Sequence, residues 1–197
     1  MLSVYLLRHG QTPYNADSNR YCGRTDIALT EKGVQQAEAV NRRLQGIQLD
    51  AVYSSPLVRA RRTAELATGG EKVQTDERLI EIDFGGWENK TMEEFVAEDP
   101  GSWARWIGDP AHNRAGNTGE SGEEVIKRLD DFFYEMLTRH AGQTILVAGH
   151  NGINRFYMAY KLGMPLKYYR RLFQENSAIT LFELDDSGEF TLKKLNA

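Results

Sequence analysis

The chain has 197 residues, of which 41% are hydrophobic and 26% charged, a composition typical of globular domains. Its formal net charge of −4 argues against a general binder of nucleic acid or membrane surfaces, so an anionic ligand would need arginines gathered in one place. The only cysteine, Cys22, excludes an internal disulfide framework and fits a reducing compartment. No segment resembles a secretory signal or a membrane span, so we expect a cytoplasmic protein.

The first segment, residues 1–7, is mostly apolar and β-prone and predicts a buried strand. It ends abruptly in Arg8-His9-Gly10, at the strand end where open α/β sheets bind ligands. Arginine offers a planar fork of donors that matches phosphate oxygens, and a neutral histidine can act as a nucleophile. The tripeptide alone is equally compatible with a strand that ends in two solvated residues.

Residues 11–29 form a polar loop, after which Thr30 is expected to cap a helix that ends near Gly46. Residues 50–54 predict a second strand, followed by a helix that Ser55 caps and that closes at residues 69–70. If the two strands are parallel, Arg59 in the first turns of this helix lies at the same sheet edge as the first motif. Its neighbours at positions 61 and 62 are expected to be solvated, so only one of these arginines should be functional.

Residues 73–82 predict a third strand with Glu81 near its end, although a single acidic residue there is more often solvated than catalytic. Residues 83–88 form an aromatic turn suited to lining a pocket, and residues 91–98 predict a short helix. Residues 99–122 show no clear period, which favours a lid, an insertion or a binding loop. Candidate substrate contacts there are Trp103, Trp106, His112, Asn113 and Arg114, although core packing of the tryptophans and solvation of the others are at least as strongly favoured.

A helix over residues 121–139 is followed by an almost wholly apolar strand, 144–150, as expected of a central parallel strand. That strand delivers a second histidine, His150, to its carboxyl end, and a helix follows from about residue 153 to 162. Residues 177–184 and 190–195 predict a C-terminal β-hairpin. The alternation of strands and helices predicts one domain over residues 1–197 with a three-layer α/β/α fold and a mainly parallel central sheet.

Five chemically capable residues are thus predicted at one sheet edge: Arg8, His9, Arg59, Glu81 and His150. No His-Glu-x-x-His spacing and no Gly-rich phosphate loop accompanies them. The set suits phosphoryl transfer without a metal ion, in which arginines stabilise the transferring charge.

At this point the chain resembles the histidine phosphatase superfamily, also called the phosphoglycerate-mutase-like family. The segments that carry the resemblance occur in the family's order over nearly the whole chain: LRHGQTPYN (7–15), GRTD (23–26), LTEKG (29–33), SSPLVRA (54–60), EIDFGGWE (81–88), GES (119–121) and GH (149–150). Segment 81–88 looks most like the small bacterial phosphatases of the α-ribazole phosphatase branch.

The resemblance implies a metal-independent phosphatase that needs no cofactor and acts on a small-molecule phosphate ester. It implies that His9 becomes phosphorylated, and that Arg8, Arg59 and His150 form the phosphate pocket, with His150 stabilising charge if protonated. It further implies that Glu81 protonates the leaving oxygen and then activates water. Additional phosphate or substrate contacts are implied at Thr12, Asn15, Cys22, Gly23 and Asn151.

Two departures from the family pattern stand out, namely Tyr14 where Trp is common and Asn151 where Gly is frequent. The region near residues 88–122, a candidate lid, has little room for the long insertion of glycolytic mutases, which disfavours a cofactor-dependent phosphoglycerate mutase. That mutase and a non-catalytic binder of phosphorylated ligands remain the alternatives. We expect no nucleic-acid or membrane partner, and the C-terminal hairpin offers an edge strand for a homodimer.

Overall fold

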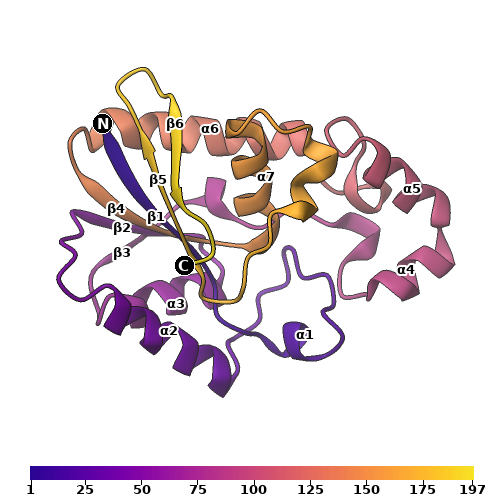
Figure 1. Ribbon diagram of the computed structural model, residues 1–197. Coiled ribbons are helices and arrows are strands. Elements are labelled where there is room, and N and C mark those ends of the chain that lie inside the picture. The colour runs from indigo at the N-terminus through magenta and orange to yellow at the C-terminus, as the bar shows by residue number, and fades with distance from the viewer.

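The computed structural model describes all 197 residues, which build one six-stranded sheet with the order β3-β2-β4-β1-β5-β6. β1 pairs in parallel with β4, β4 with β2 and β2 with β3, while β5 is antiparallel to both β1 and β6. The predicted, mainly parallel sheet is therefore confirmed (Figure 1). The strands are β1 (Leu2–Arg8), β2 (Ala51–Ser54), β3 (Val73–Thr75), β4 (Thr144–Gly149), β5 (Ile179–Leu184) and β6 (Phe190–Lys194).

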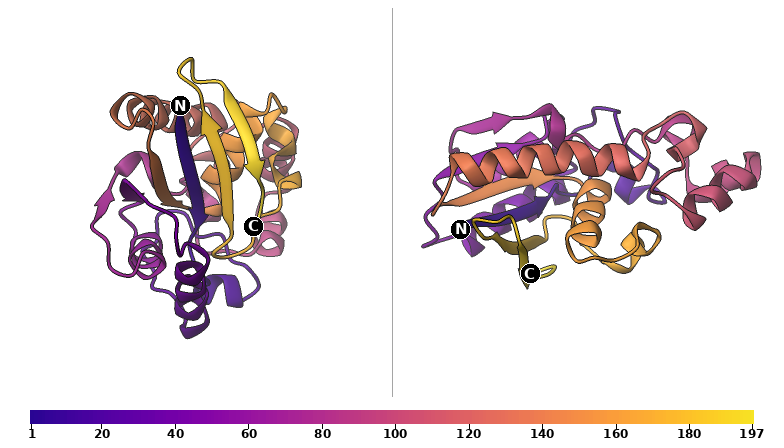
Figure 2. Two further views of the ribbon diagram at one scale, coloured as in Figure 1. Left: turned by 60° about the vertical axis from the view of Figure 1, so that its left-hand side comes forward. Right: turned by 90° about the horizontal axis from the view of Figure 1, so that it is seen from above.

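Helices cover both faces of the sheet, so the three-layer α/β/α prediction is also confirmed (Figures 1 and 2). One face carries α2 (Glu31–Arg43) and α3 (Val58–Ala67), and the other carries α6 (Gly122–Arg139) and α7 (Asn151–Lys161). The short α1 (Pro13–Ala16) lies in the first loop, and α4 (Met92–Glu98) and α5 (Pro100–Gly108) extend beyond the sheet. No helix is both long and apolar enough to cross a membrane.

Strand alternation divides the apolar side chains between two cores. Leu6 packs in a 28-residue core beneath α6 and α7, while its neighbour Leu7 packs in a nine-residue core beneath α2 and α3. The same alternation separates Ile145 from Leu146 in β4, and all four side chains are at most 2% exposed. Because both faces of β1 and β4 are buried, these strands are held rigidly, and so are the residues at their carboxyl ends.

The predicted helix cap at Thr30 is confirmed. The Thr30 hydroxyl accepts the Gly33 N–H at 3.0 Å at the start of α2. Ser121 and Glu124 form a reciprocal capping box at the start of α6. The C-terminal hairpin is confirmed as β5 and β6. α7 begins at Asn151, two residues earlier than predicted, directly after β4.

Two predicted boundaries on the β2–β3 side are wrong. α3 begins at Val58 after an extended Leu57, and Ser55 does not cap it but accepts the Leu57 N–H at 3.3 Å just before the helix. β3 ends at Thr75 because Asp76 accepts the Arg78 N–H at 2.9 Å and caps a 3₁₀ turn, η1 (Glu77–Leu79). Glu81 therefore lies in an irregular segment beyond the strand.

The prediction that residues 99–122 lack regular structure is wrong as well. They contain α5 and a 3₁₀ turn, η3 (Ala115–Asn117). Asp99 caps α5 by accepting the Ser102 N–H at 3.0 Å, and Pro100 occupies the first helical position, where its missing N–H costs nothing. Two further 3₁₀ segments are η2 (Gly85–Trp87) and η4 (Leu166–Arg171).

Candidate active site

A cleft of about 330 Å³ opens at the carboxyl ends of β1 and β4, and most of the predicted site residues line it. This is the sheet edge where the sequence predicted a site. The predicted residues in its lining are Arg8, His9, Thr12, Asn15, Cys22, Glu81 and Asn151. The other three, Gly23, Arg59 and His150, lie outside that lining, and the last two are fully buried.

His9 follows directly on β1 and is 5% exposed. Its Nδ1 lies 2.7 Å from the Gly10 carbonyl oxygen, which can only accept, so Nδ1 carries the proton and Nε2 keeps its lone pair. Burial lowers the pKa of His9 well below the usual value, and the charges of Arg59 and Arg8 lower it further. His9 is therefore a neutral imidazole with a free Nε2, the form that a nucleophile requires.

Arg8, the last residue of β1, supplies cationic donors beside His9. Its Nη1 donates to the Gln174 carbonyl oxygen at 2.6 Å, whereas its buried Nε has no protein partner. Burial lowers the pKa of Arg8 to about 10, with Glu81 opposing the shift. The guanidinium thus keeps its charge at neutral pH and offers a desolvated donor to an anion.

His150 lies against His9, with ring centroids 5.2 Å apart in an edge-on arrangement. Arg59 Nε donates to His150 Nδ1 at 3.2 Å, so the His150 proton is on Nε2, a buried atom without a protein partner. Burial lowers the pKa of His150 well below its usual value, and the Arg59 and His9 side chains add to the shift. His150 is therefore a neutral donor here, and the nearby positive charge resides on the arginines.

Arg59 is fully buried and holds the loop that forms the cleft wall. Its Nη1 donates to the Thr25 carbonyl oxygen at 2.7 Å, and its Nη2 donates to the carbonyl oxygens of Cys22 and Gly23 at 3.2 and 2.8 Å. By contrast, the arginines at 61 and 62 are exposed and pair with Glu65, as the sequence predicted. Of the three, only Arg59 contacts another predicted site residue, His150.

Glu81 is fixed by the amino-terminal turn of α7. Its carboxylate accepts the N–H groups of Gly152, Ile153 and Ile82 at 2.9, 3.0 and 2.9 Å. A carboxylate at a helix amino terminus is stabilised by these otherwise unpaired N–H donors and by the helix dipole. A Cβ at position 152 would lie 2.6 Å from Glu81 Oε1, so this close contact requires glycine.

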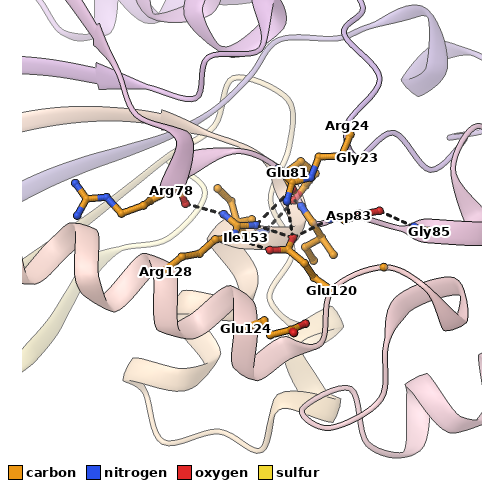
Figure 3. Close-up of polar contacts among 12 residues, drawn as sticks. Gly23, Arg24, Arg78, Glu81, Asp83, Gly85, Glu120, Glu124, Arg128 and Ile153 are labelled. Carbon is orange, nitrogen blue, oxygen red and sulfur yellow. Dashed lines mark hydrogen bonds and ion pairs between the residues drawn. The ribbon is translucent and has the colours of Figure 1, made fainter.

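A polar network behind the cleft secures the segment that carries Glu81 (Figure 3). Glu120 pairs with Arg128 at 2.9 Å and accepts the Asp83 N–H at 2.9 Å, and Arg24 joins it at 3.0 Å. Arg128 in turn donates to the Glu81 carbonyl oxygen at 3.4 Å. Burial alone would raise the pKa of Glu120, but Arg128 and the other donors lower it, so the network is ionised.

Asn15 and Thr12 both line the cleft and are hydrogen-bonded to each other. Asn15 Oδ1 accepts from the Thr12 N–H and hydroxyl, each at 3.1 Å, and from Asn176 Nδ2 at 3.2 Å. The Gly23 N–H is engaged by both Glu88 carboxylate oxygens at 3.0 Å, which directs it away from the cleft. Burial raises the pKa of the Cys22 thiol to about 11, so Cys22 lines the cleft as a neutral thiol.

None of the five candidate contacts in residues 99–122 lines the cleft. Trp106 is fully buried and Trp103 packs against the same aromatic core, while His112 is exposed and pairs with Asp109 and Glu123. Lining residues absent from the predicted set include Tyr21, Met92, Glu93, Arg155, Tyr169 and Arg170. Arg155 had one recognisable signal, because it follows Asn151 by four positions and therefore shares its helix face.

The sequence of this chain is similar to those of known phosphatases and mutases. The model of the "Histidine phosphatase superfamily (branch 1)" matches residues 4–197. Phosphoserine phosphatase 1 of Hydrogenobacter thermophilus is 32% identical over 195 residues, which cover 98% of this chain and 92% of the relative. A protein of Erwinia tasmaniensis named "Probable phosphoglycerate mutase GpmB" is 35% identical over 182 residues, which cover 91% of this chain and 84% of the relative.

Solved structures share the whole architecture. The crystal structure of the alpha-ribazole phosphatase from Shigella flexneri superposes with a TM-score of 0.84 and 28% sequence identity, and the match covers 99% of this chain and 96% of the other. The predicted resemblance therefore extends to the complete three-dimensional fold.

Proposed function

This chain belongs to the histidine phosphatase superfamily and is a phosphatase, and we propose that it hydrolyses small phosphate monoesters without a metal ion, through a phosphohistidine on His9. The substrates in the names of its relatives, phosphoserine and α-ribazole phosphate, are both small monoesters and support this substrate class. The single free thiol, Cys22, supports a cytoplasmic location.

In the first step, His9 Nε2 attacks phosphorus while the bond from phosphorus to the ester oxygen breaks. Glu81 enters this step in its protonated form; the leaving oxygen takes that proton, the alcohol departs, and Glu81 is left as the carboxylate that its three N–H donors stabilise. In the second step, the Glu81 carboxylate removes a proton from water, whose oxygen attacks phosphorus and displaces His9. Inorganic phosphate is released, and both side chains return to their starting protonation states.

One observation carries this proposal: the unprotonated Nε2 of His9 lies among desolvated donors that have no protein partner. Arg8 Nε and His150 Nε2 are both buried and unpartnered, and an isolated buried donor costs about 1–3 kcal/mol. The transferring phosphoryl group carries negative oxygens that would satisfy such donors. The arginine charges of this site take the role that a metal ion has elsewhere.

The test is a panel of phosphate monoesters assayed for inorganic phosphate in the presence of a strong chelator. We expect phosphate and alcohol in equal amounts, with turnover unchanged by the chelator because no metal takes part. Turnover that disappears on chelation and returns with a divalent ion would contradict the metal-free mechanism.

The second candidate is a phosphoglycerate mutase, which the name of the Erwinia relative favours. A mutase returns the phosphoryl group to another hydroxyl, whereas a phosphatase transfers it to water. Incubation with 3-phosphoglycerate and 2,3-bisphosphoglycerate separates the two, since a mutase forms 2-phosphoglycerate and a phosphatase releases phosphate. Ligand binding without either product would instead support the non-catalytic alternative.

A further inference from the structure

The outer wall of the cleft carries two arginines that the mechanism does not use. Arg155 projects from the first turns of α7, and Arg170 lies at the end of η4. Both line the same cleft as Arg8 and His9. They are therefore placed to meet the part of a bound ester that lies beyond its phosphate group.

Neither arginine has an acidic partner. No carboxylate oxygen lies within 4.0 Å of Arg155 or Arg170, although Glu93 also lines this cleft. The cleft arginine at position 20 differs, because it pairs with Asp17 at 3.0 Å and with Glu94 at 2.8 Å. The lining contains four arginines against two glutamates in a chain of net charge −4.

Aromatic residues hold both side chains in place without neutralising them. Arg155 Nε donates to the Tyr169 carbonyl oxygen at 3.3 Å, and its guanidinium carbon lies 5.1 Å from the centre of the Tyr169 ring. Arg170 Nη1 donates to the Tyr21 hydroxyl at 3.0 Å, and its guanidinium lies over the Trp103 ring. Both Nη groups of Arg155 remain without a protein acceptor, which leaves a preorganised fork free for a ligand.

The two guanidinium groups also act on each other. Burial lowers the pKa of Arg155, Tyr169 opposes this shift, and the positive charge of Arg170 adds to the lowering. Two like charges in a partly desolvated cleft are costly unless an anion joins them. Burial acts to lower the pKa of Arg170, but Tyr21 and Tyr169 raise it above its usual value, so the aromatic residues offset part of this repulsion without supplying a carboxylate.

We propose that Arg155 and Arg170 form a second anion subsite and that the substrate is a phosphate monoester with a second anionic group, a carboxylate or another phosphate, at its far end. This inference rests on the proposed function, since it assumes that the phosphate end is held at Arg8 and His9. The cleft volume of about 330 Å³ suits a small ester of this kind.

The test compares 3-phosphoglycerate with glycerol 3-phosphate, which has a CH₂OH group in place of the carboxylate. Binding is measured by calorimetry on the His9→Ala protein, so that turnover does not interfere. We expect 3-phosphoglycerate to bind at least about tenfold more tightly, because a charge-assisted bidentate contact replaces a neutral one. A comparison of glycerol 1,3-bisphosphate with glycerol 3-phosphate tests whether a second phosphate group also increases the affinity.

In the Arg155→Gln background, the affinity ratio within each pair is expected to fall close to one. The control Arg171→Gln removes a neighbouring arginine that stacks on Tyr168 outside the cleft lining, and it should keep the parental ratio. Equal affinities within both pairs in the parental protein, or a ratio that survives Arg155→Gln, would overturn the subsite. Failure of the wild-type enzyme to release phosphate would instead overturn the proposed function, and this binding comparison is independent of that result.

Discussion

The inner and outer ends of the cleft are built in different ways. At the inner end, each reactive side chain is fixed by backbone groups or by another buried side chain: His9 by the Gly10 carbonyl, Glu81 by three N–H groups, and His150 by Arg59. At the outer end, Arg155 and Arg170 rest on aromatic rings and are partly exposed. The residues that react with the phosphate group are therefore held by rigid elements. The residues proposed to select the substrate are surface side chains that can be substituted with little loss of stability.

The largest loss at the inner end is expected for Glu81→Gln with esters whose leaving group is a basic alkoxide. A glutamine cannot donate a carboxyl proton, so phosphorylation of His9 should slow by about 10²–10⁴-fold, the usual scale of general acid catalysis. p-Nitrophenyl phosphate should be affected far less, because its phenolate leaves without a proton. Rapid-quench kinetics on both substrates provide the measurement, and equal slowing would move the search for the acid to Asp83 or Glu88.

Arg59→Lys is the next largest expected effect. Lysine cannot reproduce the fork that holds three loop carbonyls, nor the Nε–H that fixes His150, so about 2–4 kcal/mol of transition-state stabilisation should be lost. The matched controls are lysine substitutions at the exposed Arg61 and Arg62, which should leave kcat/KM unchanged. Wild-type kinetics in Arg59→Lys would show that these contacts of Arg59 do not contribute to transition-state stabilisation.

Gly152→Ala tests whether the helix amino terminus positions Glu81. The new Cβ would meet Glu81 Oε1 at 2.6 Å and should displace the carboxylate, which lowers kcat by about 10–100-fold for a misplacement near 1 Å. Gly108→Ala is the control, because no atom lies within 4 Å of the Cβ built there. A Gly152→Ala enzyme with wild-type kcat would show that Glu81 tolerates this displacement.

These inner-end residues also show how far the sequence predicts the site. Arg8, His9 and His150 could be placed because regular apolar strands bring the residues that follow them to one edge of a parallel sheet. Arg128 and Arg170 could not be placed, because an arginine on a helix or in a 3₁₀ turn looks the same in sequence whether it faces water or a cleft; for Arg155 the only signal was its four-residue spacing from Asn151. The end of β3 could not be predicted, because the side chain of Asp76 accepts a backbone N–H and starts a 3₁₀ turn where the residue pattern still favours a strand.

The smallest expected effect concerns the protonation of histidine side chains. The buried His9 and His150 are compared with the exposed His112. The lowered pKa values of His9 and His150 predict that neither ring titrates between about pH 8 and 6 in NMR spectra. His112 serves as the internal control, because Asp109 raises its pKa above the usual value. A titration of His9 near pH 6.5 would contradict the desolvated, neutral nucleophile.

The same shifts set the direction of a stability change. The two buried histidines stay neutral in the folded state but bind protons in the unfolded chain below about pH 6.5. Their neutral burial therefore favours folding most above that pH, and the free energy of unfolding should decrease as the pH falls through it. Denaturant titrations at pH 7.5 and 5.5 measure this change, and equal stabilities would contradict it.

The central claim is that His9 carries the phosphoryl group, and trapping the phosphoenzyme tests it most directly. The wild-type enzyme is mixed with radiolabelled ester, quenched within milliseconds, and assayed for protein-bound phosphate that is labile in acid and stable in base, as expected of phosphohistidine. We predict such phosphate on the wild-type protein and none on His9→Ala with any substrate. Phosphoenzyme that persists in His9→Ala would contradict the account.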